Sequence, residues 1–155
     1  MSTANTPTLE LRNLEVSYTV RGIDRQVLRD VSLSIAPGEA YGLVGESGCG
    51  KSTAAFAAMR YLPRNGKITA GSILFEGKNI VDIGEGDVAK LRRSAISMVY
   101  QNPATALNPT IRIGKQIAEV FELNGASKTD ALEMAQAALT RVQISDPAQV
   151  MRRYA

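Results

Sequence analysis

Alternating apolar and polar residues dominate the first part of the chain. Over residues 9–18 the apolar positions follow a period of two with one interruption, which predicts a half-buried strand containing a bulge. A second alternating run, residues 31–35, ends at Pro37-Gly38, a pair typical of turns. We therefore expect two strands followed by a tight turn.

Two later runs do not alternate. Residues 41–44 are wholly apolar, which is typical of a strand covered on both faces in a parallel sheet, and they lead directly into glycines. Residues 96–100 predict another buried strand. Together the two runs indicate a parallel core beside the alternating strands.

The segments between these runs predict helices, a loop and a hairpin from their composition and periodicity. They are a helix over residues 52–62, a loop over residues 63–71, a strand over residues 72–75 turned by Glu76-Gly77, and a short helix over residues 88–93.

Helical periodicity dominates the last part of the chain. Residues 111–123 place apolar side chains on one helical face, and Asn124-Gly125 supplies a stop. Ser127 and Asp130 form a capping-box pattern that begins a second helix. Asp146-Pro147 is a start signal for a third helix, because aspartate caps well and proline suits the first helical position.

Composition excludes several classes of protein. The chain has no histidine and one cysteine, so neither an internal disulfide nor a zinc site is expected. Its beginning lacks the order of a signal peptide, and no apolar run approaches the roughly 20 residues that span a bilayer, so we expect a cytoplasmic protein. The net charge is +3, and the basic residues are scattered without interleaved aromatic residues, so nucleic acid is not an expected partner.

One stretch carries specific chemistry, because it fits the phosphate-loop pattern G-x-x-x-x-G-K-[ST] in full and lies between a predicted strand and a predicted helix. It comprises Gly45, Glu46, Ser47, Gly48, Cys49, Gly50, Lys51, Ser52 and Thr53. Glycines let successive backbone N–H groups face an anion, and the start of the helix adds its positive dipole end. The pattern predicts a site for nucleotide phosphates.

Each side chain near the end of this stretch has an expected role. Lys51 supplies a positive charge to the β- and γ-phosphates, Ser52 offers its hydroxyl to Mg²⁺, and Thr53 lies within reach of the α-phosphate. The phosphate loop by itself leaves kinases, GTPases, recombinases and transporters open, because one fold supports many chemistries.

Four features in order narrow this choice: Tyr18 on an early strand, the turn Pro37-Gly38-Glu39, the phosphate loop, and Gln101 after a buried strand. This order resembles the ATP-binding subunit of ABC transporters. The stretch Gln101-Asn102-Pro103, followed by Leu107-Asn108-Pro109, is similar to importers of oligopeptides, dipeptides and nickel.

The resemblance implies ATP and Mg²⁺ as cofactors. It implies that Tyr18 stacks on adenine, although a tyrosine packed in the core is the alternative. It implies that Gln101 reaches Mg²⁺ and the attacking water, so that Ser52 and Gln101 are the metal-contacting residues; an ordinary surface amide is the alternative for Gln101. Cys49 is expected to occupy a small-residue position of the loop.

The resemblance also implies an architecture: an α/β P-loop NTPase (RecA-like) core with an antiparallel β subdomain and the start of a helical subdomain. We expect a tail over residues 1–8, the β subdomain and core over residues 9–110, and helices over residues 111–155. The family's Leu-Ser-Gly-Gly signature, its acidic strand end and its histidine do not occur in the 155 residues, so we expect a truncated chain that does not hydrolyse ATP alone.

The partners that the resemblance implies are membrane permease subunits and a second ATPase subunit, with the protein at the inner face of the cell membrane. Two alternatives stay open. One is a non-catalytic nucleotide-binding or regulatory fragment, and the other is a soluble P-loop kinase or GTPase.

Overall fold

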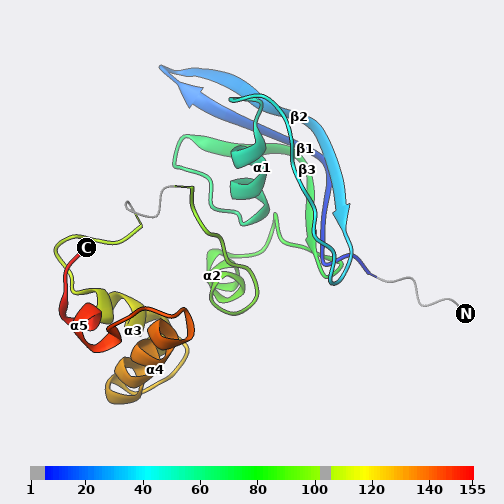
Figure 1. Cartoon of the computed structure of the whole chain (residues 1–155). Helices are drawn as coiled ribbons and strands as arrows, with labels where there is room; N and C mark the ends of the chain where they lie inside the picture. The colour runs from blue at the N-terminus through cyan, green and yellow to red at the C-terminus, as the bar shows by residue number, and fades with distance from the viewer. Residues whose placement is uncertain (1–5, 102–105) are drawn as a thin grey trace, which may run out of the picture. The chain divides into compact units, whose positions relative to one another are not determined.

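The computed structural model describes residues 6–101 and 106–155, and the chain divides into two compact units, one up to Arg92 and one from Arg93. The first unit contains a β-sheet and helix α1 (Lys51–Ala58). Helix α2 (Glu85–Ser94) lies mostly in this unit and ends two residues beyond it. The second unit contains three helices, α3 to α5 (Figure 1).

The sheet is antiparallel throughout and has the strand order β2-β1-β3-β4. Its strands are β1 (Leu9–Val20), β2 (Ile23–Ile35), β3 (Gly66–Phe75) and β4 (Lys78–Asn79). Two residues with positive φ link each hairpin, Arg21-Gly22 and Glu76-Gly77, which matches the left-handed backbone of tight hairpin turns. The predicted early strand with its bulge and the predicted second hairpin are both confirmed.

A paired irregularity in β1 and β2 explains why the sequence predicted only the end of β2. Asn13 and Asp30 both have φ of 47°, and the Asn13 Nδ2 atom donates a hydrogen bond of 2.6 Å to Asp30 Oδ1. Such a bulge shifts the side-chain parity of a strand. The core-facing Leu28 therefore does not continue the alternation of residues 31–35. For this reason the pattern did not reveal that β2 begins as early as Ile23.

The prediction of a loop over residues 63–71 is wrong from Gly66 onward, where β3 begins. Residues 66–70 are rich in small and polar side chains, which is typical of turns. They nevertheless pair with β1, Lys67 opposite Ser17 and Ile68 opposite Val16. This tertiary pairing outweighs the weak local preference.

Helix α1 ends at Ala58, four residues before the predicted end. Arg60 has φ of 52° and donates its backbone N–H to Ala57 O at 2.7 Å, and the N–H of Tyr61 donates to Phe56 O at 2.8 Å. These two bonds form a Schellman motif, which turns the chain out of the helix before the proline is reached.

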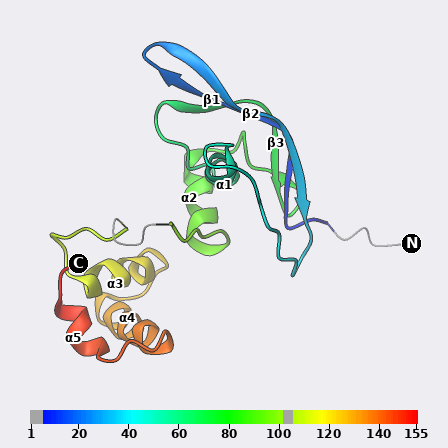
Figure 2. The ribbon, with the colours of Figure 1, turned by 45° about the horizontal axis from the view of Figure 1, so that its top comes forward.

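Helix α1 packs against one face of the sheet (Figure 1 and Figure 2). Where helix and sheet meet, the helix contributes small side chains and the strands contribute larger branched ones. The small side chains let the helix approach the sheet closely. The buried cluster comprises Leu11, Leu14, Val16, Leu28, Ala54, Ala57, Ala58, Ile73 and Ile80.

Two predictions of buried strands are wrong. Residues 41–44 and 96–100 have no strand assignment, and Val44 is 98% exposed and Val99 94% exposed. A strand covered on both faces is stable only when neighbouring strands complete its hydrogen bonds and helices cover it. In the described ranges neither run is paired with a strand.

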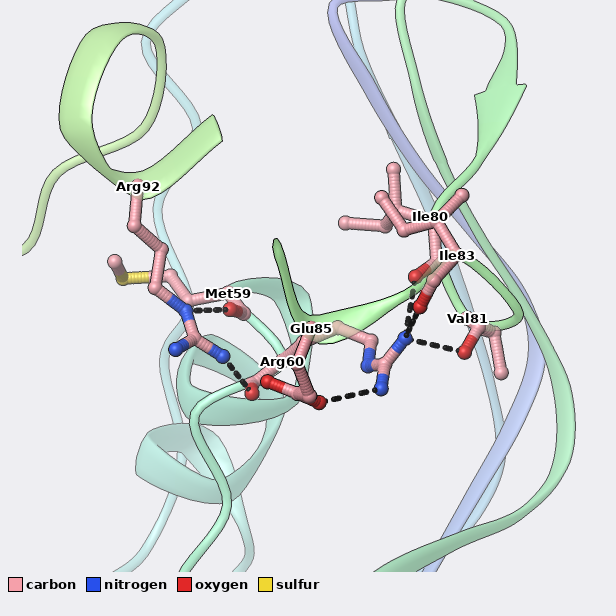
Figure 3. A network of polar contacts seen from close by, with 7 residues as sticks. All are labelled: Met59, Arg60, Ile80, Val81, Ile83, Glu85 and Arg92. Atoms are coloured by element: carbon pink, nitrogen blue, oxygen red, sulfur yellow. Dashed lines mark hydrogen bonds and ion pairs between the residues drawn. The ribbon is translucent and has the colours of Figure 1, made fainter. Parts of the chain in front are cut away.

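Two arginines tie the end of α1 to the chain around α2 (Figure 3). Arg60 Nη1 donates to the carbonyl oxygens of Ile80, Val81 and Ile83 at 2.9, 2.5 and 3.0 Å, and its Nη2 bonds Glu85 at 3.0 Å. Arg92 donates in turn to the carbonyl oxygens of Met59, at 3.0 Å, and Arg60. The backbone carbonyls at the end of α1 therefore have charged donors.

The second unit consists of α3 (Ile113–Leu123), α4 (Lys128–Arg141) and α5 (Pro147–Arg152), packed around Ala118, Ala131 and Ala135. The predicted caps are confirmed, because Ser127 accepts a hydrogen bond from the Asp130 N–H and Asp146 accepts one from the Gln149 N–H. Among the helices of the described ranges, none combines the length and the apolar character needed to cross a membrane.

Candidate phosphate-binding site

The glycine-rich loop runs into the first turn of α1. Gly48 has φ of 82° and Gly50 has φ of 99°, both in the left-handed region that favours glycine. Gly50 is also the N-cap residue and has no side chain to accept a hydrogen bond from the helix. The N–H groups at the start of α1 are therefore available to an anion, at the positive end of the helix dipole.

Lys51 places its positive charge inside the bend of this loop. Its Nζ atom donates to Gly45 O at 2.7 Å and to Glu46 O at 2.6 Å, and it lies 3.4 Å from Cys49 Sγ. The loop carbonyls hold the ammonium group beside the exposed glycine backbone.

Residues of strand β2 lie close to the loop at Gly50. A Cβ atom added at Gly50 would lie 2.8 Å from Leu28 Cδ2 and 3.5 Å from Val27 O. Leu28 is itself only 3% exposed. Sequence reasoning missed Leu28 as a support of the loop, because the bulge at Asp30 removes it from the alternating pattern that would have marked it.

Cys49 and Gly45 face each other across the loop. The thiol is free and exposed, and a Cβ atom added at Gly45 would lie 3.0 Å from its sulfur. The expectation that position 49 needs a small residue stays a prediction. The exposed thiol is accessible to reagents, and its sulfur lies close to the Lys51 ammonium group.

Tyr18 and Gln101 lie outside the loop. Tyr18 is on β1, where it pairs with Arg25 and Gly66, and its partly buried side chain packs against the main core. Gln101 is exposed and belongs to the unit that begins at Arg93. Neither takes part in the hydrogen bonds of Lys51. Two further members of the predicted glutamine motif, Asn102 and Pro103, lie outside the described residues.

A charged group lies on β2 opposite Thr19, the residue after Tyr18. Asp24 accepts hydrogen bonds from Lys67 Nζ at 2.5 Å and from Thr19 Oγ1 at 2.6 Å. The bond from Lys67, followed by that from Thr19, holds the pKa of the Asp24 carboxyl below its ordinary value. This carboxylate on β2 is therefore linked to one side chain of β1 and to one of β3.

The donor set suits a phosphate group. The loop offers backbone N–H groups, one ammonium group on Lys51 and the exposed hydroxyl of Ser52, whereas Glu46 is its single carboxylate. For a magnesium ion the loop offers fewer suitable ligands. The described residues contain no group of three or more histidine, cysteine, aspartate or glutamate side chains that could hold a metal. From the loop, the Ser52 hydroxyl could serve as a magnesium ligand, and phosphate oxygens of a ligand could supply others.

Comparison with known proteins bears on this site. The family model described as ABC transporter matches residues 28–154. The dipeptide transport ATP-binding protein DppD of Lactococcus lactis is 40% identical, covering 89% of this chain and 40% of DppD. The oligopeptide transport ATP-binding protein OppD of Escherichia coli is 39% identical, covering 94% of this chain and 43% of OppD. The chain thus spans less than half the length of these curated relatives.

The fold is similar to a solved structure, the dimeric ATP-binding cassette MJ0796 bound to ADP and Pi. The TM-score is 0.77 at 21% identity, and the match covers 94% of this chain and 61% of the cassette. Agreement at this level concerns the fold alone. It confirms the predicted α/β fold class with an antiparallel β part.

Proposed function

The chain belongs to the ABC transporter family, and we propose that it forms the nucleotide-binding part of an ATP-binding subunit of a peptide importer. One observation carries this proposal: the Lys51 ammonium group is held at 2.6–2.7 Å by two carbonyls of the glycine-rich loop that precedes α1. The names of the relatives support the solute class, since they transport dipeptides or oligopeptides.

Each loop residue is proposed to make a different contact with the phosphates. N–H groups of residues 48–52 donate to phosphate oxygens, and Lys51 exchanges its bonds to Gly45 O and Glu46 O for bonds to the β- and γ-phosphates. Ser52 would hold a magnesium ion through its hydroxyl, and Thr53 would lie near the α-phosphate. Magnesium, when bound, neutralises negative charge that would otherwise repel an attacking water.

Two residues outside the loop are also proposed to contribute to nucleotide binding. The ring of Tyr18 forms a platform for the adenine base, because an aromatic ring stacks on any base. As the resemblance to the family implies, the amide of Gln101 would help to hold magnesium and to orient the attacking water, since an amide can both accept and donate. Lys51 and Gln101 are thus the groups proposed to act on the reacting phosphate.

The proposal also includes partners. We expect a second ATP-binding subunit, as the resemblance to the family implies. We further expect permease subunits that hold the protein at the inner face of the cell membrane, in keeping with the transport role named for the relatives.

Calorimetric titration of the chain with MgATP tests the central step. Lys51→Ala should weaken binding roughly tenfold or more, because a hydrogen bond to a charged group contributes about 1.5–3 kcal/mol. Lys115→Ala, which removes an exposed lysine of α3, is the matched control and should leave the affinity unchanged. Equal affinities for the parent chain and Lys51→Ala would remove the basis of the proposal.

A further inference from the structure

We infer that Gly66 is a positioning residue for the nucleotide base, because its bare backbone holds the ring of Tyr18 in place. The inference rests on the proposed function, in which Tyr18 carries adenine. It adds a residue from a different strand to that site. The supporting contacts come from β3 and from the turn that precedes it.

The contact between Tyr18 and Gly66 leaves no room for a side chain at position 66. A Cβ atom added there would lie 2.8 Å from Cε1 and 3.2 Å from Cδ1 of Tyr18. It would also lie 3.3 Å from Cβ of Leu62. Gly66 does not have a positive φ angle, so its backbone conformation does not by itself require glycine. The glycine is therefore needed for the approach of the ring.

The turn before Gly66 is hydrogen-bonded to Thr19, the residue after Tyr18. The backbone N–H of Thr19 donates to Asn65 O at 2.8 Å, and Asn65 Nδ2 donates to Thr19 O at 3.3 Å. The N–H of Gly66 closes the turn on Pro63 O at 2.8 Å. Tyr18 and Gly66 are also direct partners in the β1–β3 register. The backbone that carries the ring is therefore tied to the backbone of its support.

One short stretch of chain connects this support to the phosphate loop. Residues 51–66 contain α1, which begins at Lys51, and then the turn that ends at Gly66. Leu62 and Tyr18 both pack against the same core cluster as α1. The spacing between the phosphate groups and the base is thus set by a single packed segment, and a methyl group at position 66 would push the base platform out of that spacing.

A double-mutant cycle tests the inference on the full chain, with MgATP and magnesium tripolyphosphate as probes in calorimetry. Tyr18→Ala should weaken MgATP binding roughly five- to hundredfold, the range for loss of one stacked base. Gly66→Ala should weaken MgATP binding roughly three- to thirtyfold and leave tripolyphosphate unchanged. In the Tyr18→Ala background, Gly66→Ala should have no further effect, because its action passes through the ring.

Controls separate this inference from the proposed function. Gly86→Ala makes the same chemical change where nothing lies within 4 Å, and it should bind like the parent. If Gly66→Ala does not fold by circular dichroism, Asn65→Ala loosens the same turn without added bulk and should weaken MgATP two- to fivefold, again only when Tyr18 is present. Additive effects of Gly66→Ala and Tyr18→Ala, or an equal loss of tripolyphosphate binding, would overturn the inference. Loss of the Lys51 dependence would overturn the proposed function.

Discussion

At the scale of single residues, Asp24 illustrates how a surface carboxylate is stabilised by its neighbours. Its carboxylate accepts from Lys67 and Thr19, so the charged form is favoured and the pKa lies below its ordinary value. A group with a lowered folded pKa stabilises the protein above its unfolded pKa. That contribution is lost as the pH falls through the folded pKa.

Lys67→Met should raise the pKa of Asp24 toward the ordinary carboxyl value, because the largest cause of the lowering is removed. The carboxyl carbon of Asp24 can be followed by NMR as the pH is lowered. Lys115→Met, on an exposed position of α3, serves as the control. An unchanged titration in Lys67→Met would mean that the ion pair with Lys67 is not formed in solution.

The backbone shape of the proposed phosphate loop could be predicted from the sequence, whereas the residues that support it could not. The pattern from Gly45 to Thr53 encodes its own backbone shape, since Gly48 and Gly50 take left-handed φ angles and Lys51 returns to the loop carbonyls. Leu28 and Gly66 act through contacts with residues far away in the sequence. Contacts of that kind depend on strand register, which a bulge changes without leaving a local signal.

At the scale of elements, the end of α1 depends on Arg92. Its guanidinium donates to the carbonyl oxygens of Met59 and Arg60 and lies 5.3 Å from the ring centre of Tyr61. Carbonyl groups at the C-terminal end of a helix lack partners within the helix and carry the negative end of its dipole. Arg92 satisfies two backbone carbonyls immediately after α1.

Arg92→Ala should lower the free energy of unfolding by about 1–3 kcal/mol, because two partly buried carbonyls lose a charged donor. For a domain of this size the melting temperature should fall by several degrees, which differential scanning calorimetry would detect. Arg29→Ala, at an exposed position of β2, is the control. Equal melting temperatures for Arg92→Ala and Arg29→Ala would show that the carbonyls find other donors.

Elements were predictable where local signals decide them. The hairpin at Glu76-Gly77 and the caps Ser127 and Asp146 follow from residues that are neighbours in the sequence. Residues 41–44 and 96–100 read as buried strands because they are apolar, but strand formation requires a partner, and neither run has one in the described chain. Hydrophobicity alone therefore indicates the capacity to pair rather than the pairing itself.

At the scale of the whole molecule, the chain consists of two separately packed units. The second unit depends on the close approach of α3 and α5. A Cβ atom added at Gly114 would lie 2.7 Å from Met151 O and 2.8 Å from Met151 Sδ. Glycine at this helical position accepts a loss of helix propensity of about 1 kcal/mol in exchange for that approach.

Gly114→Ala should destabilise the second unit by about 1–3 kcal/mol, since overpacking outweighs the gain in propensity. Hydrogen exchange read by mass spectrometry should show faster exchange in α3 and α5 while β1 and β3 keep their protection. Gly86→Ala, which meets nothing within 4 Å, should leave both units unchanged. Faster exchange in β1 as well would mean that the two units unfold together.

The position of the chain's single cysteine has a practical consequence. Cys49 is exposed, and its sulfur lies 3.4 Å from the Lys51 ammonium that would bind phosphate. A thiol reagent therefore attaches at one place only, within the proposed binding surface, and no engineered cysteine is needed. The rate of labelling becomes a footprint of ligand occupancy, and it allows candidate nucleotides to be ranked on the unaltered chain.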